Sequence, residues 1–315
     1  MPVTVRRVAN EADKALALEI YNLVIPDEAV TSEEVVAFEA LTLHTAEFLV
    51  SVDGEDVGSA VCAVQPQHPA AAFTLVTVLP RARGRGAGST LYASCLDFAR
   101  AHDRELLETR VAAEDEASLS FAVRRGFVEQ QRDEWLELDL RKHVPQPVAL
   151  PDVEIVSLAD RPDLALGAYD VACESLPDIP GEEDWTPPPR DAWVENSLFR
   201  VHTVPSTFLA IAGGDVVGYA KLRVLPKTDV GEHGMTAVKR AWRRRGIAAA
   251  LKAAQIEWAL QNGLVRLRTA NELRNAGMRT LNERLGYVPT SGRVTLRGPF
   301  GAGASASGPN SDTRL

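Results

Sequence analysis

The sequence predicts a chain of mixed helices and strands, of class α/β in its α+β form, built from two tandem domains. Strand-like and helix-like segments alternate along both halves of the chain. A length of 315 residues suits two domains of ordinary size, and a hydrophobic content of 45% is enough for two cores. The third observation is that a set of local features recurs at one constant separation of 160 residues.

The repeat is clearest in two turns that are rich in arginine and glycine, within residues 78–91 and 238–252. The same spacing holds far from these turns, and so long a shared register indicates a duplicated domain rather than two unrelated glycine turns. The corresponding positions are Arg83 and Arg243, Gly86 and Gly246, Gly58 and Gly218, and Gly126-Phe127 and Gly286-Tyr287.

The second arginine turn leads into a predicted helix. Apolar residues recur at helical spacing over 247–258, and Asn262-Gly263 supplies a stop signal. Arg243, Arg244 and Arg245 crowd against the helix start, where the positive end of the helix dipole repels them. A bound anion would reverse this balance, because free helix N–H groups and guanidinium groups both attract it. The sequence therefore predicts a phosphate site.

The other elements follow one order in both halves. In the first half we expect strands at 3–7, 48–52, 57–64, 72–79, 106–111 and 135–140, the last an edge strand, and helices at 11–23, 32–43, 86–101 and 115–125. In the second half we expect strands at 153–157, 208–212, 216–224, 232–238 and 265–269, with a helix at 160–174 after the first of them. A proline-rich linker at 141–151 separates the predicted domains 1–142 and 152–297, and the Gly/Ser-rich tail 298–315 is expected to be disordered.

Both turns match the pattern R-x-x-G-x-G/A, from Arg83 to Gly88 and from Arg243 to Ala248. Each is followed by a helix that ends in a hydrophobic-Gly-aromatic step, complete at 275–287 (NAGMRTLNERLGY) and weaker at 115–127. On these motifs the chain resembles tandem-domain members of the GNAT superfamily of acyl-CoA-dependent N-acyltransferases. The resemblance implies that each domain is a mixed, mostly antiparallel sheet flanked by helices.

The resemblance also implies acetyl-CoA as co-substrate and no metal. Backbone N–H groups of the turns would bind the diphosphate, and a strand that splays from its neighbour, often at a bulge, would offer a free N–H to the thioester carbonyl. Thr236 and Val76 would line the pantetheine arm. The cofactor-binding residues implied are Thr236, Val238, Arg243, Arg244, Arg245, Gly246, Ala248, Asn275 and Asn282 in the second copy, and Val78, Arg83, Gly84, Gly86 and Gly88 in the first.

Catalytic residues are expected in the second copy. The strand before its turn carries Glu232 and His233, and either could take the proton of the amine, directly or through a water. A loop carboxylate and a surface histidine are the alternative interpretation of the same two residues. Residues 72–78 of the first copy contain no acid, base or histidine. We therefore expect the second domain to be catalytic and the first to be a degenerate copy that could still bind the cofactor.

The sequence departs from the family pattern at three places. Many members carry a tyrosine on the second helix that protonates the departing thiolate, but Asn282 and Ala122 stand there in this chain. Asparagine donates a hydrogen bond but is no acid, so the general acid stays unassigned. Asp115 replaces the asparagine that Asn275 matches, and Arg244 stands where a glycine is usual.

Composition limits the possible partners. With 34 Lys and Arg against 43 Asp and Glu the net charge is −9, which repels polyanions and disfavours a nucleic-acid-binding function for the arginine turns. Cys62, Cys95 and Cys173 lie far apart without metal-binding spacing, and the first two are expected to be buried thiols. No apolar run of 18 residues and no signal peptide are present, so we expect no membrane partner and a cytoplasmic protein.

The sequence thus predicts an N-acyltransferase that moves an acetyl group from acetyl-CoA to the primary amine of a small cationic acceptor. A proline-rich insertion at 176–190, with acidic residues 182–184 beside Trp185, is either a solvated loop or a lid that favours a cationic amine. A non-catalytic acyl-CoA-binding or regulatory protein is the alternative, favoured by the weak first copy and the missing tyrosine. The tandem architecture is similar to that of mycothiol synthases, in which the second half is active, although no residue selects that substrate. Acceptor identity, acyl chain length and oligomeric state stay open.

Overall fold

A computed structural model describes residues 2–66, 68–143, 148, 150–179, 186–199, 203–226 and 228–299. The first half contains β1 (Val3–Arg7), α1 (Glu11–Val24), α2 (Ser32–Glu39), β2 (His44–Val52), β3 (Glu55–Val64), β4 (Ala71–Val78), α3 (Ala87–Arg100), β5 (Leu106–Ala112), α4 (Glu116–Val123) and β6 (Val128–Asp139). The second half contains β7 (Glu154–Ser157), α5 (Ala165–Ser175), α6 (Arg190–Val194), the π-helical turn η6 (Glu195–Phe199), β8 (Phe208–Ala212), β9 (Asp215–Val224), β10 (Val230–Val238), α7 (Ile247–Gln261), β11 (Arg266–Glu272), α8 (Ala276–Arg284) and β12 (Val288–Gly298).

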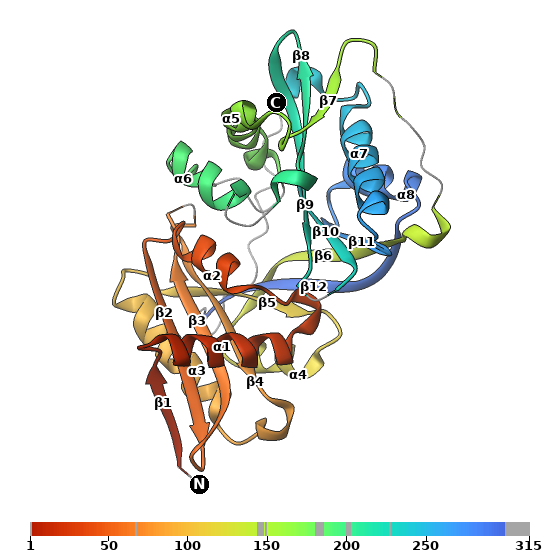
Figure 1. Ribbon diagram of the computed structural model, residues 1–315. Coiled ribbons are helices and arrows are strands. Elements are labelled where there is room, and N and C mark those ends of the chain that lie inside the picture. Colours follow the sequence, from red (N-terminus) through yellow and green to blue (C-terminus); the bar gives the residue numbers. More distant parts are fainter. Residues whose placement is uncertain are drawn as a thin grey trace, which may run out of the picture.

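The strands of the described residues form one continuous sheet in the order β1-β2-β3-β4-β5-β12-β6-β11-β10-β9-β8-β7. Only the pairs β4–β5 and β10–β11 are parallel, so the prediction of a mixed, mostly antiparallel sheet flanked by helices is confirmed. In each half the helix that follows the arginine turn covers one face of the sheet. A helix from earlier in the same half covers the other face (Figure 1). No described helix combines the length and the apolar character that crossing a membrane requires.

Short polar side chains determine where several helices begin. Asn10 accepts a hydrogen bond from the third residue of α1, and Thr31 and Glu34 form a capping box at α2. Asp115 and Asn275 cap α4 and α8 in the same way. α4 and α8 therefore begin with the same capping geometry, although the capping residue is an aspartate in α4 and an asparagine in α8.

Two predictions about elements were wrong. The helix predicted over 160–174 begins only at Ala165, because Pro162 holds Arg161 outside the helical region and opens a 3₁₀ turn over Pro162–Leu164. The segment 135–140, predicted as an edge strand, is part of β6, which lies inside the sheet between β12 and β11. Its alternating pattern reflects two differently packed faces and not exposure at an edge.

The last strand of each half is exchanged with the other half. β6 pairs with β11 along Asp133–Asp139, and β12 pairs with β5 along Arg293–Gly298. β6 and β12 also pair with each other, and Asp133 lies opposite Arg293, its counterpart in the repeat. In Figure 1 the two strands run across the junction between the first half below and the second half above. The predicted domains 1–142 and 152–297 are therefore joined by a shared sheet as well as by the linker.

Each apolar core is completed by a strand from the other half. Val294 and Leu296 of β12 are buried in the first-half core beside Phe127. Leu138 of β6 is buried in the second-half core beside Tyr287. Cys62 and Cys95, predicted to be buried thiols, are buried and free in the first-half core. The stability of each half consequently depends on a strand that the other half contributes.

We expect Leu296→Ala to cost about 2–5 kcal/mol of the free energy of unfolding, because it leaves a cavity in a closely packed core. Hydrogen exchange should accelerate at β5 of the first half, although residue 296 belongs to the second half of the chain. Leu138→Ala is the matched control and should accelerate exchange at β11 and α7 instead. Faster exchange only in the half that carries the substitution would contradict the strand exchange.

Candidate functional site

Both arginine turns have the same backbone shape. Gly86 (φ 94°) precedes α3 and Gly246 (φ 86°) precedes α7, and neither helix has a side-chain cap. The first turn of each helix therefore leaves N–H groups without a partner from a capping side chain. Gly84 has φ 76° and Arg244 has φ 61° at corresponding positions. Arg244 keeps the left-handed conformation of the glycine that it replaces, at a cost of about 1–2 kcal/mol.

Two of the predicted arginines hold the turns in shape. Arg83 donates from Nε to the carbonyl oxygen of Val78 at 3.2 Å, and Arg243 donates to that of Val238 at 2.9 Å. Each side chain thus fastens its turn to the end of the preceding strand. Arg243 also forms an ion pair with Asp178 at 2.7 Å. These contacts give both arginines a structural role beside the predicted binding role.

The arginines that follow differ between the halves. Arg85 forms an ion pair with Asp53 of the β2–β3 hairpin, whereas the counterpart of Asp53 is Gly213. Arg245 stacks on Trp242, with its guanidinium carbon 4.6 Å from the ring centroid. In the described part of the chain neither Arg244 nor Arg245 has a carboxylate partner. The second turn therefore keeps two cations available to an anion.

The sheet opens next to the second turn. β10 and β11 pair in parallel only from Val230 to Glu232 and diverge beyond that point. The β9–β10 register shifts between His233 and Thr236, which is a β-bulge that interrupts the ladder at Gly234 and Met235. The bulge expected before the turn is thus present in the second half.

The corresponding strand of the first half is regular. β4 and β5 also pair only along Ala71–Phe73, so the first half diverges at the same place. However, β3 and β4 keep one register from Phe73 to Val78 without a shift. The first half has the divergence but lacks the bulge.

Four polar side chains with unpartnered atoms line the α7 face of the opening in the second half. They are Thr236 of β10, Lys252 of α7, Asn271 of β11 and Asn282 of α8, and the atoms are Oγ1, Nζ, Nδ2 and both amide atoms of Asn282. Lys252 is 1% exposed and Asn282 is fully buried. An unpaired buried polar group costs about 1–3 kcal/mol, so the set indicates a place where a ligand completes the hydrogen bonds.

The strand neighbours of Thr236 and Asn271 show to which face of the sheet these two side chains point. Thr236 lies two residues before Val238, which packs against Leu251 of α7. Asn271 lies four residues after Leu267, which packs against Ile256 of α7. Because side chains of a strand alternate between faces, Thr236 and Asn271 both point to the side that α7 covers.

The same four positions carry three aliphatic side chains and one tyrosine in the first half. Val76, Tyr92, Val111 and Ala122 all pack in or against the first-half core. Arg125 of that half lies over the ring of Phe121 at 3.5 Å and donates to Ser89 at 2.7 Å, which ties the end of α4 to the first turn of α3. The polar lining is therefore confined to the second half.

His233 lies on the α7 face and is enclosed. Its Nδ1 is 2.9 Å from Oε1 of Gln255, and its Nε2 is 2.5 Å from the hydroxyl of Tyr287. Burial, and then the nearby Lys252, lower the pKa of His233 well below its usual range, so the ring is neutral at neutral pH. With both nitrogens engaged, His233 fixes the positions of Gln255 and Tyr287.

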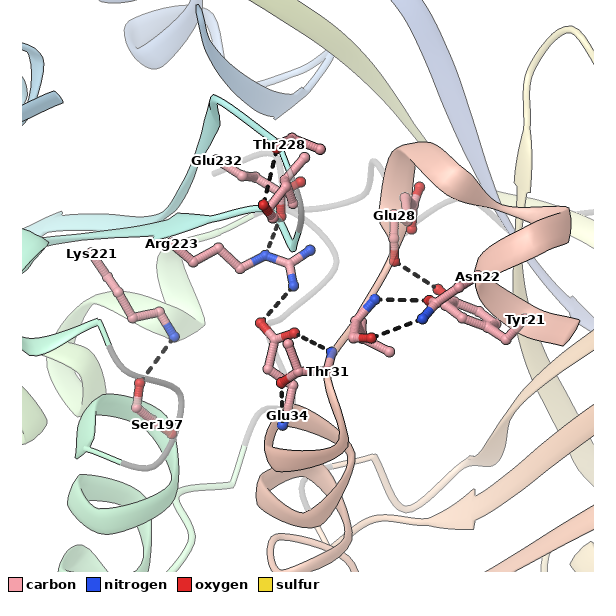
Figure 2. A network of polar contacts seen from close by, with 12 residues as sticks. Tyr21, Asn22, Glu28, Thr31, Glu34, Ser197, Lys221, Arg223, Thr228 and Glu232 are labelled. Atoms are coloured by element: carbon pink, nitrogen blue, oxygen red, sulfur yellow. Dashed lines mark hydrogen bonds and ion pairs between the residues drawn. The ribbon is translucent and has the colours of Figure 1, made fainter. Parts of the chain in front are cut away.

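Glu232 points to the opposite face of β10. It forms ion pairs with Arg268 and, at 3.1 Å, with Arg223. Arg223 extends the network to Glu34 of α2 in the first half at 2.7 Å, as Figure 2 shows. The structure therefore places the two predicted proton acceptors on opposite sides of one strand and does not bring them together.

Sequence reasoning missed two lysines of the second half. Lys252 has an unpartnered Nζ that lies 5.3 Å from the centroid of the Tyr287 ring. Lys221 lies beside the bulge on the face of Glu232, and a Cβ added to Gly234 would meet its Cε at 2.9 Å. A comparison of the two copies could have found both, because their counterparts are Tyr92 and Val61.

The other predicted positions have simpler surroundings. Asn275 accepts a hydrogen bond from the N–H of Met278 at 3.2 Å as the cap of α8, and Ala248 and Gly88 lie in the first turns of α7 and α3. Residues 182–185, which carry the acidic run and Trp185, lie outside the described residues. In the described ranges no group of three His, Cys, Asp or Glu side chains is arranged to hold a metal ion.

Comparisons with known proteins point to one family. A model of the acetyltransferase (GNAT) family matches residues 17–127 and 169–287. The chain is 35% identical over 83 residues to L-2,4-diaminobutyric acid acetyltransferase of Nocardia farcinica, which is 25% of this chain and 43% of that protein. The match thus spans less than half of the length of this curated relative.

Solved structures share the whole architecture. A tandem GNAT protein from the clavulanic acid biosynthesis pathway has a TM-score of 0.76 at 20% identity, over 94% of this chain and 98% of its own. A GCN5-related N-acetyltransferase from Sphaerobacter thermophilus has a TM-score of 0.71 at 20% identity, over 94% and 95%. At this level of identity the likeness shows the fold.

Lys252→Met should make the free protein more stable near neutral pH. Burial lowers the pKa of Lys252 from 10.5 to about 7, so between these values the unfolded chain binds a proton that the folded chain does not. Stability of the native lysine form therefore rises with pH across this window. The methionine variant should gain on the order of 3 kcal/mol at pH 7, and less as the pH approaches 10.

Urea unfolding at several pH values between 7 and 9.5 measures this difference. Lys142→Met is the matched control, because Lys142 is exposed and its removal should change the free energy of unfolding by less than about 0.5 kcal/mol. A difference between Lys252→Met and the native chain that does not change with pH would contradict the assigned burial of the amine.

Proposed function

Because the chain belongs to the acetyltransferase (GNAT) family, we propose that it is an acyl-CoA-dependent N-acetyltransferase whose second half carries the catalytic site. The acetyl group would pass from acetyl-CoA to the primary amine of a small acceptor. The observation that carries this assignment is the set of four unpartnered polar side chains beside the β10 bulge. Their counterparts in the first half, three aliphatic residues and Tyr92, pack in or against the first-half core.

The residues present fit acetyl-CoA. The free N–H groups at the start of α7, around Gly246 and Ala248, suit the diphosphate, and Arg244 and Arg245 supply positive charge there. Thr236 and Asn282 offer polar atoms to the pantetheine arm. The interrupted ladder between His233 and Thr236 leaves backbone N–H groups for the thioester carbonyl. Acetyl-CoA itself supplies the acyl group in an activated form.

We assign the removal of the amine proton to Glu232 and a positioning role to His233. The coenzyme-binding side chains occupy the α7 face, so the acceptor has the opposite face of β10, where Glu232 lies. Both carboxylate oxygens of Glu232 contact arginines, so proton uptake requires one of these contacts to loosen. His233 is buried on the other face with a lowered pKa, which makes it a weak base at neutral pH.

The acceptor is proposed to be a small amine that carries positive charge. The curated relative is named for L-2,4-diaminobutyric acid, a compound with two amino groups, and this supports an acceptor of similar size. The alternative of a non-catalytic acyl-CoA-binding protein rests on Asn282, which cannot replace the tyrosine as an acid. Release of free thiol from acetyl-CoA with a panel of amines decides between the two.

Gly246→Asp should abolish coenzyme binding and turnover, whereas Gly86→Asp should leave most of both. Each glycine has a similar left-handed φ before its helix, so both substitutions bring the same backbone strain and the same carboxylate. Only at Gly246 would this carboxylate repel the diphosphate that we place there.

Isothermal titration with coenzyme A and a thiol-release assay measure these effects. We expect one binding site per chain, and a loss of at least about 100-fold in affinity for Gly246→Asp against less than about threefold for Gly86→Asp. Equal losses from both substitutions would refute the assignment of catalysis to the second half.

A further inference from the structure

Three cations among the described residues, Lys221, Arg223 and Arg268, gather on the acceptor face of β10 around the carboxylates of Glu34 and Glu232. Figure 2 shows Lys221, Arg223 and both carboxylates. Arg223 binds both carboxylates, and Arg268 binds Glu232. Within the described residues this leaves the ammonium of Lys221 without a carboxylate, and its hydrogen bond goes to the backbone carbonyl of Ser197 at 3.2 Å.

Lys221 lies at the place where the reaction would occur. It sits in β9 between the partners of His233 and Thr236, directly across from the bulge. Its aliphatic chain crosses Gly234, where even a methyl group would collide with it. The bulge therefore positions the ammonium beside the backbone groups assigned to the thioester.

The first half of the chain helps to build this site. Oε2 of Glu34 accepts a hydrogen bond from the N–H of Thr31 at 2.8 Å in the capping box of α2, while Oε1 accepts one from Arg223 at 2.7 Å. The helix start thus holds Glu34 in place, and Glu34 holds Arg223. The first half therefore contributes Glu34 to the charged cluster.

The cluster has no equivalent in the first half. The counterparts of Lys221, Arg223 and Glu232 are Val61, Ala63 and Ala72. The counterpart of Arg268 is Glu108, which binds Arg297 of the exchanged strand β12. General demands of the fold therefore do not require these charges, because the same fold forms without them.

An ammonium that is partly removed from water and lacks an anion is unfavourable. Burial, followed by repulsion from Arg223, lowers the pKa of Lys221 to about 8, and the attraction of Glu34 and Glu232 does not compensate for this. A carboxylate ligand would correct the imbalance, because a charge-assisted hydrogen bond is about twice as strong as a neutral one. A ligand that carries only positive charge would increase the repulsion.

We propose that Lys221 binds the carboxylate of the acceptor, so that the acceptor is an amino acid and not a simple amine. This inference rests on the proposed function and narrows its substrate class. A short diamino acid satisfies both conditions, since it brings one carboxylate for Lys221 and a primary amine for acetylation. Lys221 is then a residue that determines specificity, while the removal of the amine proton stays assigned to Glu232.

The test compares pairs of acceptors that differ only by the carboxylate. The pairs are L-2,4-diaminobutyrate with 1,3-diaminopropane, L-ornithine with putrescine, and L-lysine with cadaverine, each assayed for thiol release with acetyl-CoA. For the best pair we expect the native chain to prefer the amino acid by about 10- to 100-fold in kcat/KM, the usual value of one charged hydrogen bond.

Lys221→Met should remove this preference by raising KM for the amino acid while changing the diamine by less than about threefold. Lys221→Arg should keep most of the preference, and Lys142→Met, which removes an exposed lysine, should behave like the native chain. Coenzyme A affinity serves as the folding control, because its proposed site lies on the other face of β10.

The inference is overturned if the native chain acetylates diamines as well as amino acids, or if Lys221→Met loses kcat/KM equally for both classes. Either result would leave the proposed function intact. Failure of the proposed function looks different, because no probe then yields free thiol. In that case calorimetry with the coenzyme-saturated chain decides. Binding of the amino acids that is lost in Lys221→Met supports the site, and absence of binding overturns it.

Discussion

The site depends on the short parallel contact between β10 and β11. Three residue pairs hold the two strands together, and beyond Glu232 they separate while the bulge at Gly234 interrupts the ladder on the other side. A sheet that loses backbone pairing on both sides of one strand leaves polar backbone groups that need partners. Everything assigned to the reaction lies around this opening, with Lys252 and Asn282 on one face and Lys221 and Glu232 on the other.

The strand exchange makes the second half depend structurally on the first half, although the first half has no such polar lining. β6 completes the second-half core through Leu136 and Leu138, so the second half cannot pack its own core without it. The same half supplies Glu34, which anchors Arg223 from across the junction. Removing the first half would expose a sheet edge and an apolar core, whether or not that half binds a ligand of its own.

Local signals in the sequence predicted the order of most elements and the two arginine turns. Hydrophobic periodicity and glycine positions determine these features within a few residues of the chain. The bulge was expected from the family resemblance, and it interrupts β10 but not β4. The strand exchange was not predictable in this way, because the alternation in β6 is the same whether its neighbour is β5 or β11. Lys221 and Lys252 were missed for a similar reason, since a lysine beside apolar residues usually indicates a solvated face.

The two halves differ in the side chains that occupy the opening of the sheet. The first half fills its opening with Val76, Tyr92, Val111 and Ala122, and it places Val61 where the second half has Lys221. The second half keeps unpaired hydroxyl, amide and lysine amine groups in the same space, and each lowers the free energy of unfolding while it has no partner. A ligand that pairs these groups would regain that free energy as affinity, so the groups that lower the stability of the free chain are also those best placed to bind.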